Sequence, residues 1–156
     1  MGNAPVSDIA ITYDVALVTV DRIPGSMHLI SKLFNSIAAQ NINIDLINQA
    51  PPYKGTINLS FSISARDIVK TIETLNSFKQ EVPALMVEID ADNAKIAISG
   101  EQMKNIPGVA ARLFTILAKN EVDIKLISTS ETDISYLVYM KDVDRAVNAI
   151  KTEYRL

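Results

Sequence analysis

The sequence contains an internal repeat, and this repeat limits the fold more than any other feature. The segment LFNSIAAQNINIDLI (residues 33–47) aligns with LFTILAKNEVDIKLI (residues 113–127) at a constant offset of 80 positions, with coincident apolar positions. Each copy also has an Ile-Pro-Gly sequence before its apolar segment, at residues 23–25 and 106–108. Such self-similarity indicates two copies of one structural unit. We expect each unit to use its Pro-Gly as a turn that leads into a helix.

Hydrophobic periodicity predicts the order of elements in each copy. For the first copy it predicts strands at 15–20, 42–50, 56–63 and 84–90, and helices at 26–40 and 65–78. For the second copy it predicts strands at 94–99, 122–129 and 134–140, and helices at 109–120 and 142–154. The first order is β-α-β-β-α-β, which is typical of a ferredoxin-like unit. The second copy follows the same order but lacks the last strand.

A further predicted strand, residues 6–12, precedes the first copy and has no role in it. We expect this strand to complete the second sheet, because an unfilled position would leave backbone groups exposed at an edge. The predicted fold class is therefore α+β, with two ferredoxin-like βαββαβ units, the first inserted in the second, and antiparallel sheets with helices on one face. The predicted domains are 14–92, and 5–13 plus 93–156.

Composition excludes several classes of function. The chain has 48% hydrophobic residues but only 6% aromatics and no Trp, so the core should be aliphatic. With no Cys and one His, we expect no disulfide and no metal site. A net charge of −3 without a run of basic residues argues against nucleic acid as a partner. No apolar stretch has the length of a membrane span and the N-terminus does not look like a signal peptide, so we expect a cytoplasmic protein.

No catalytic set is recognisable, since phosphate-binding and dinucleotide-binding glycine patterns and paired acid/base groups are all missing from the sequence. A binding site is a better hypothesis. The first N–H groups of a helix favour a carboxylate, and Asp45, Asn48 and Gln49 end the adjacent strand in the first copy. The helix start and the Asp45 carboxylate would together suit a ligand that carries both a carboxylate and an ammonium group. The alternative is that both Pro-Gly sequences are purely structural turns.

The second copy resembles a known family. The segment GEQMKNIPGVAARLFTILAKNEVDIKLISTSETDISYLV (residues 100–138) is similar to the second ACT domain of aspartate kinases, through Gly100, Met103, PGVA (107–110) and LISTSE (126–131). The first copy resembles the first ACT domain of that family, and the resemblance extends over essentially the whole chain. The catalytic domain of the family is missing from this sequence. The chain therefore resembles either a regulatory fragment or a separate regulatory subunit.

The resemblance implies an allosteric role without catalytic residues in this chain. It implies a homodimer through the ACT domains, an amino-acid effector at their interface, and an aspartate kinase catalytic domain as partner, with ATP and magnesium expected only there. It favours feedback inhibition by lysine over threonine, because the turn at residues 24–29 is extended. A sensor or dimerisation module of another protein is the alternative. By position, the effector-binding residues would be Ile23, Gly25, Ser26, Leu29, Ile30, Ile44, Asp45, Asn48 and Gln49. A second pocket or dimer contact would comprise Asn105, Gly108, Val109, Ile124, Ser128, Thr129 and Glu131.

Overall fold

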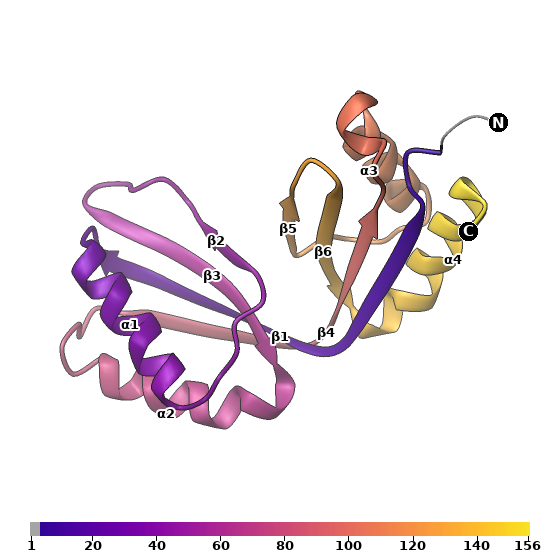
Figure 1. Cartoon of the computed structure of the whole chain (residues 1–156). Coiled ribbons are helices and arrows are strands. Elements are labelled where there is room, and N and C mark those ends of the chain that lie inside the picture. Colours follow the sequence, from indigo (N-terminus) through magenta and orange to yellow (C-terminus); the bar gives the residue numbers. More distant parts are fainter. Residues whose placement is uncertain (1–3) are drawn as a thin grey trace. The chain divides into compact units, whose positions relative to one another are not determined.

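The computed structural model describes residues 4–156 and divides the chain into two compact units (Figure 1). The inserted unit is Val15–Asp92, and the outer unit combines the chain up to Asp14 with Asn93–Leu156. The predicted fold class is confirmed, because each unit has the expected antiparallel strand order with its two helices. Residues 1–3, which open the N-terminal sequence considered for a signal peptide, lie outside the described residues.

The inserted unit has the strand order β2-β3-β1-β4. Its two helices share one hydrophobic core with the sheet, so they cover the same face. This arrangement follows from the clean alternation of apolar residues along β3, which leaves one apolar and one polar face. The elements are β1 (Asp8–Pro24), α1 (Met27–Ala39), β2 (Ile47–Gln49), β3 (Thr56–Ser64), a 3-10 turn (Ala65–Asp67), α2 (Ile68–Phe78) and β4 (Met86–Ser99).

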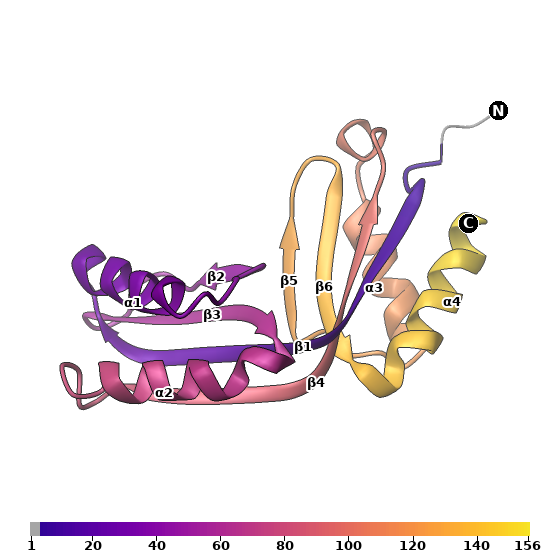
Figure 2. The same cartoon turned by 60° about the horizontal axis from the view of Figure 1, so that its bottom comes forward.

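The outer unit has the equivalent order β1-β4-β6-β5, which is completed by the start of the chain. The Ser7 N–H donates to the Ser99 carbonyl at 2.8 Å, and Val6 is fully buried in the core of this unit. Figure 2 shows α3 and α4 on the same side of β4 and β6. The remaining elements are a 3-10 turn (Met103–Asn105), α3 (Val109–Lys119), β5 (Leu126–Thr129), β6 (Asp133–Tyr139), a 3-10 turn (Met140–Asp142) and α4 (Val143–Tyr154).

Two strands are longer than predicted. The segments 6–12 and 15–20 form the single β1, and the segments 84–90 and 94–99 form the single β4. Each strand continues through one aspartate in the left-handed region, Asp14 with φ 54° and Asp92 with φ 62°. Aspartate adopts this conformation more readily than most residues, so the strand can continue through it without ending. The sequence offers no glycine or proline at either place, which is why a continuous strand is consistent with it.

Two strands are shorter than predicted. The segment 42–50 contains only the three residues of β2, and the segment 122–129 contains only the four residues of β5. In the inserted unit, Ser62 faces two successive residues, since it accepts from the Asp45 N–H at 3.1 Å and donates to the Leu46 carbonyl at 3.0 Å. The Ser62 hydroxyl also accepts from the Leu46 N–H at 2.9 Å. This two-against-one pairing is a bulge, and it interrupts the regular ladder before β2.

The core of the inserted unit is mainly aliphatic, as the composition predicted. Ile57, Leu59 and Ile63 on β3 are buried against α1 and α2. The main aromatic contact is between Phe34 on α1 and Phe61 on β3, whose ring centroids are 5.7 Å apart at an interplanar angle of 65°. Edge-to-face packing of this kind stabilises the fold beyond the free energy that burial of the two rings contributes.

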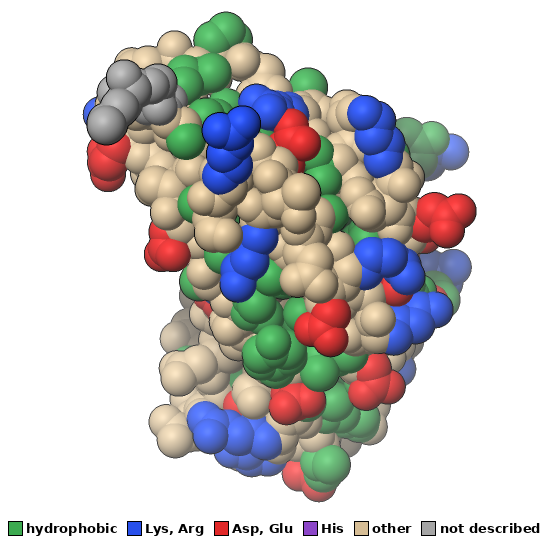
Figure 3. Space-filling view, turned by 90° about the vertical axis from the view of Figure 1, so that its right-hand side faces the viewer, with side chains coloured by type: hydrophobic (Ala, Val, Ile, Leu, Met, Phe, Trp, Pro, Cys, Tyr) green, Lys and Arg blue, Asp and Glu red, His purple; other side chains and the backbone are tan. Residues whose placement is uncertain are grey.

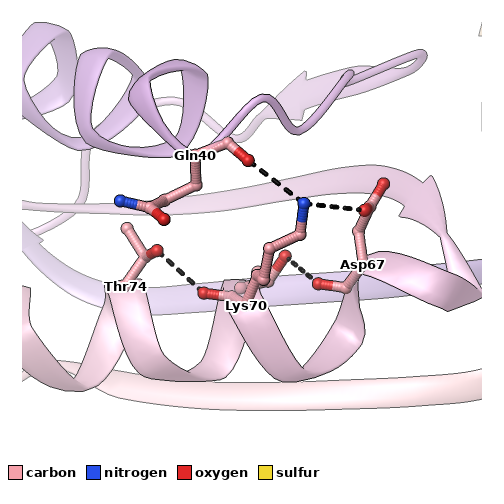
Figure 4. Close-up of polar contacts among 5 residues, drawn as sticks. Gln40, Asp67, Lys70 and Thr74 are labelled. Atoms are coloured by element: carbon pink, nitrogen blue, oxygen red, sulfur yellow. Dashed lines mark hydrogen bonds and ion pairs between the residues drawn. The ribbon is translucent and has the colours of Figure 1, made fainter.

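A lysine links the two helices of the inserted unit (Figure 4). The Lys70 Nζ on α2 donates to the Gln40 carbonyl at the end of α1, at 3.2 Å. The same Nζ lies 3.6 Å from the Asp67 Oδ1, and Asp67 is buried where α2 begins. A cation near the last carbonyl groups of a helix is favourable, and here it also joins the two helices.

Candidate functional site

The predicted carboxylate site is the start of α1. Two amides there are already used, because the Gly25 N–H donates to the Gly55 carbonyl at 2.9 Å and the Ser26 N–H donates to the Pro24 carbonyl at 2.7 Å. The next N–H groups, of residues 27–29, precede the intrahelical bonds, and the Ser26 side chain makes no capping hydrogen bond. The first turn of α1 contains no acidic residue. The partial positive charge of this helix start is therefore not offset by the helix itself.

The apolar residues predicted around this turn have different surroundings. Ile23 is fully buried and Ile30 is nearly so, which places both side chains inside the core beneath the turn. Leu29 and Ile44 are partly buried against the same core. Met27 was not predicted as a site residue, yet its side chain is 72% exposed at the first position of α1. Met27 falls within the apolar repeat of the helix, three residues before Ile30 and seven before Phe34, so the sequence predicts a buried side chain and its exposure follows only from the structure.

The polar residues predicted on the facing strand lie at an edge of the sheet. β2 is the last strand in the order, so its outer side has no neighbouring strand in the part of the chain that the structure describes. Asn48 pairs with Ser60, and Gln49 pairs with Leu59. Because paired residues share a face, Gln49 lies on the helix-covered face and Asn48 on the opposite one. The two side chains therefore do not point into a single pocket of this unit.

Within one chain, Asp45 lies far from the start of α1. Its N–H pairs with Ser62, whereas Pro24, just before α1, pairs with Thr56 six positions away along β3. At about 3.3 Å per residue, the two places are about 20 Å apart. An amino acid carries its α-ammonium and carboxylate on one carbon atom and cannot span this distance. A socket made by a single chain from Asp45 and the helix start is therefore excluded.

The two Pro-Gly sequences are not equivalent in the structure. Pro24 is the last residue of β1 and leads almost directly into α1. Pro107 follows a 3-10 turn, and Gly108 is the N-cap of α3 with φ 85°. That conformation favours glycine, so Gly108 serves the backbone of the turn. Three extra residues between the proline and the phenylalanine of the first copy allow the earlier helix start.

The second set of predicted residues is mostly at one end of the outer unit. The Gly100 N–H donates to the Thr132 carbonyl at 3.0 Å, which holds the β5–β6 turn beside the connection from β4 to α3. Val109 is buried, and Glu131 is exposed in the turn. Ile124 precedes β5 and lies toward the other end of that strand. The predicted residues at the α3 end are Asn105, Gly108, Val109, Ser128, Thr129 and Glu131.

The repeat places Lys125 in the outer unit where the inserted unit has Asp45. The Lys125 Nζ donates to the Asn93 Oδ1 at 2.6 Å and lies 3.4 Å from the centroid of the Tyr139 ring. Asn93 is fully buried. The outer unit therefore has a cation held by its own residues at this position, and it offers no equivalent carboxylate for an ammonium group.

The helices of the outer unit form a groove of about 520 Å³ between α3 and α4. Arg112 in this groove donates from Nε to the Glu153 Oε1 at 2.9 Å, and this hydrogen bond raises the pKa of the Arg112 guanidinium. Arg145, also in the groove, pairs with Asp142. Figure 3 shows basic, acidic and apolar side chains mixed on the face that it displays. The groove therefore has most of its charge paired.

Residues 4–156 lack two features that would point to other functions. No group of three or more His, Cys, Asp or Glu side chains among them is arranged to hold a metal ion. None of the helices in this range has the length and apolar character that crossing a membrane requires.

The chain is similar to a known domain family, to an aspartokinase and to two solved structures of aspartate kinases. A family model described as the ACT domain matches residues 96–154. The aspartokinase of Bacillus sp. (strain MGA3) is 34% identical over 154 residues, which cover 99% of this chain and 38% of that protein. The ligand-free regulatory subunit of aspartate kinase from Thermus thermophilus has a TM-score of 0.85 at 25% identity, with 95% of this chain and 97% of that chain covered. The aspartate kinase of Synechocystis has a TM-score of 0.92 at 28% identity, with 99% of this chain and 28% of that chain covered.

The matches agree on one part of these proteins. The chain spans 38% of the length of the Bacillus aspartokinase, but it corresponds to almost the whole of the Thermus regulatory subunit. The order of elements, the inserted unit and the sequence of the outer unit all fit that assignment. Residues 96–154 match the ACT domain, and over nearly its whole length the chain is similar to the regulatory regions of aspartate kinases.

Proposed function

We propose that this chain binds an amino-acid effector and transmits feedback inhibition to an aspartate kinase catalytic domain in the cytoplasm. Lysine is the favoured effector and threonine the next candidate. The observation that carries the proposal is the start of α1, where the amides of residues 27–29 have no capping side chain and no acidic neighbour in the first turn. Such a group of amides favours a carboxylate. The similarity to a regulatory subunit over 97% of its length supports the same role.

We further propose that the site is completed by a second copy of this chain. The outer edge of β2 is available for pairing, and Ile47 on it is 54% exposed. If two β2 strands pair antiparallel about a two-fold axis, the partner strand runs in the reverse direction. Asp45 of the partner subunit then comes to the end of the sheet where α1 starts. Dimerisation would therefore bring together Asp45 and the start of α1, which lie about 20 Å apart within one chain.

In this arrangement each part of the amino acid has a complementary group. The N–H groups at the start of α1 would donate hydrogen bonds to the carboxylate, and Asp45 of the partner subunit would accept hydrogen bonds from the α-ammonium. Gln49, on the helix-covered face, would contribute to the side-chain end of the pocket. The outer unit carries Lys125 at the matching position. We therefore expect the inserted units alone to bind the effector, with one effector for each chain.

The proposed regulation requires that the effector binds one arrangement of the paired chains better than another, since equal binding shifts nothing. A coupling free energy of about 1–3 kcal/mol would change kinase affinity or activity about 5–150-fold. The phosphoryl transfer, with its ATP and magnesium, would belong to the kinase catalytic domain. This chain would bind the effector and change the way in which the two copies pair.

Isothermal titration with lysine, threonine and methionine tests the proposal. We expect heat of binding for lysine, or failing that for threonine, at one site per chain. Asp45→Asn should weaken binding at least about tenfold, because it removes the partner of the ammonium. Asp123→Asn, which changes an exposed carboxylate of the outer unit, is the matched control. Absence of heat with all three amino acids, together with a dimer whose melting temperature ignores them, would favour a plain dimerisation module instead.

A further inference from the structure

The inserted unit contains a cleft of about 690 Å³ that is separate from the β2 edge. It lies at the end of the sheet where β1 stops. One wall is the turn at residues 53–56 and the other is the segment 81–84 after α2. Leu29 is shared with the predicted effector site, but Asp45, Asn48 and Gln49 do not line the cleft.

The lining of this cleft is mainly apolar with cations among it. Pro24, Leu29 and the residues Val82, Pro83 and Ala84 supply the apolar part. Arg22 and Lys54 supply two positive charges. The one carboxylate in the lining, Glu81, forms an ion pair with Lys32 outside it. The charge that remains uncompensated in the lining is therefore positive.

The backbone presents both cations at an energetic cost. Lys54 has φ 49° and Gly55 has φ 80°, the conformation of a tight hairpin turn with two left-handed residues, in which asparagine, aspartate or glycine is usual at the first position. Arg22 has φ 60°, and the register between β1 and β3 shifts between Val20 and Ile23 around it. A left-handed conformation is uncommon for lysine and arginine. Seven non-glycine residues in the described part of the chain have a positive φ, and two of them are the cations of this cleft.

We propose that this cleft binds a small amphipathic anion. The apolar body of the anion would pack on the apolar lining of the cleft. Removing both surfaces from water would favour binding. Its carboxylate or phosphate group would pair with Arg22 and Lys54, since both groups accept charged hydrogen bonds of this kind. The site shares Leu29 and the start of α1 with the proposed amino-acid site, but it uses Arg22 and Lys54 in place of Asp45 and the edge of β2.

The test is an NMR titration of the whole ¹⁵N-labelled chain, with every probe below its critical micelle concentration. The probes are octanoate, octyl phosphate, inorganic phosphate and octylamine. We expect saturable shifts at residues 22–29, 53–56 and 81–84 with octanoate or octyl phosphate, and the tighter of the two identifies the preferred anionic group. Phosphate has no apolar body and octylamine has the wrong charge, so each should bind at least about tenfold more weakly.

Two variants remove the cations without disturbing the backbone. Asparagine tolerates a left-handed conformation, so Arg22→Asn and Lys54→Asn should keep the fold while removing the charges. Each should weaken octanoate or octyl phosphate about fivefold, as expected for a partly exposed charge. Lys104→Asn in the outer unit and Asp45→Asn should leave binding unchanged, and the latter separates this site from the amino-acid site. Equal binding of octylamine, undiminished binding to a variant that combines Arg22→Asn with Lys54→Asn, or no shift with any probe would overturn the proposal.

Discussion

Arg145 donates a hydrogen bond to the Asp142 Oδ1 at 2.7 Å and another to the Glu121 carbonyl at 3.0 Å, which joins the start of α4 to the end of α3. The inserted unit repeats this arrangement with Lys70 and Asp67, 3.6 Å apart. Both carboxylates are buried, whereas both cations are about half exposed. The repeat therefore preserves a polar link between the two helices of each unit although the cation differs.

Asp142→Ala should destabilise the protein by about 1–2 kcal/mol. The variant removes a hydrogen bond to a charged group, and the exposure of Arg145 keeps the loss at the lower end of the range for such bonds. The free energy of unfolding in urea measures the effect. Asp123→Ala, at an exposed site, should change it by less than about 0.5 kcal/mol. Equal losses in the two variants would mean that the link between the helices contributes nothing.

Gly100→Ala should detach the N-terminal segment from the outer unit. A Cβ atom at residue 100 would lie 2.1 Å from the carbonyl oxygen of Pro5, so the backbone would have to move. We expect a loss of about 1–3 kcal/mol and faster proteolysis near residues 5–7. Gly25→Ala is the matched control, because its Cβ would lie 3.4 Å from the Gly55 carbonyl oxygen. An N-terminal segment that stays protected in Gly100→Ala would contradict the close contact.

Alkaline pH should weaken the outer unit through two buried phenols. The hydroxyls of Tyr136 and Tyr154 are buried without a hydrogen-bond partner in the described part of the chain, and burial raises the pKa of each. A raised pKa means that the folded state holds the proton more tightly. Its contribution to stability is complete below the unfolded pKa of about 10 and is lost as the pH rises above it.

The Tyr136→Phe variant tests this pH dependence. At neutral pH its free energy of unfolding should equal that of the unchanged protein or exceed it by up to about 1 kcal/mol, because an unpaired buried hydroxyl is removed. Above pH of about 10 the decline in stability should be smaller in the variant. Urea unfolding over a pH series supplies the comparison, with Tyr53→Phe, an exposed tyrosine, as control. Parallel declines in all three proteins would exclude the buried phenol as the cause.

The sequence predicted the parts of the fold that depend on periodic patterns. The alternation of Ile57, Leu59, Phe61 and Ile63 identified β3, and the count of strands predicted an inserted unit. It could not predict the lengths of β2 and β5, because the bulge opposite Ser62 depends on hydrogen bonds between distant residues. Nor could it place the polar links at Asp67 and Asp142.

The candidate site was predictable in composition but not in geometry. Asp45 and the start of α1 are adjacent elements in the chain, and their separation follows only from the strand register with β3. The similar Pro-Gly sequences also hid two different turns. Pro24 ends a strand, while Gly108 caps a helix in the left-handed region. The two copies are therefore alike in their apolar cores, but their similar Pro-Gly sequences form different turns.

The repeat also supplies a matched pair for testing the two cores. Phe34 and Phe114 are at equivalent positions, but Phe34 packs edge-on against Phe61 whereas Phe114 is 45% exposed. Phe34→Ala should therefore lower the free energy of unfolding by about 2 kcal/mol more than Phe114→Ala, because it loses both burial and the aromatic contact. Urea unfolding of the two variants measures the difference. An equal or larger loss in Phe114→Ala would show that its ring is covered in solution, as it would be if another copy or a kinase domain packed on α3.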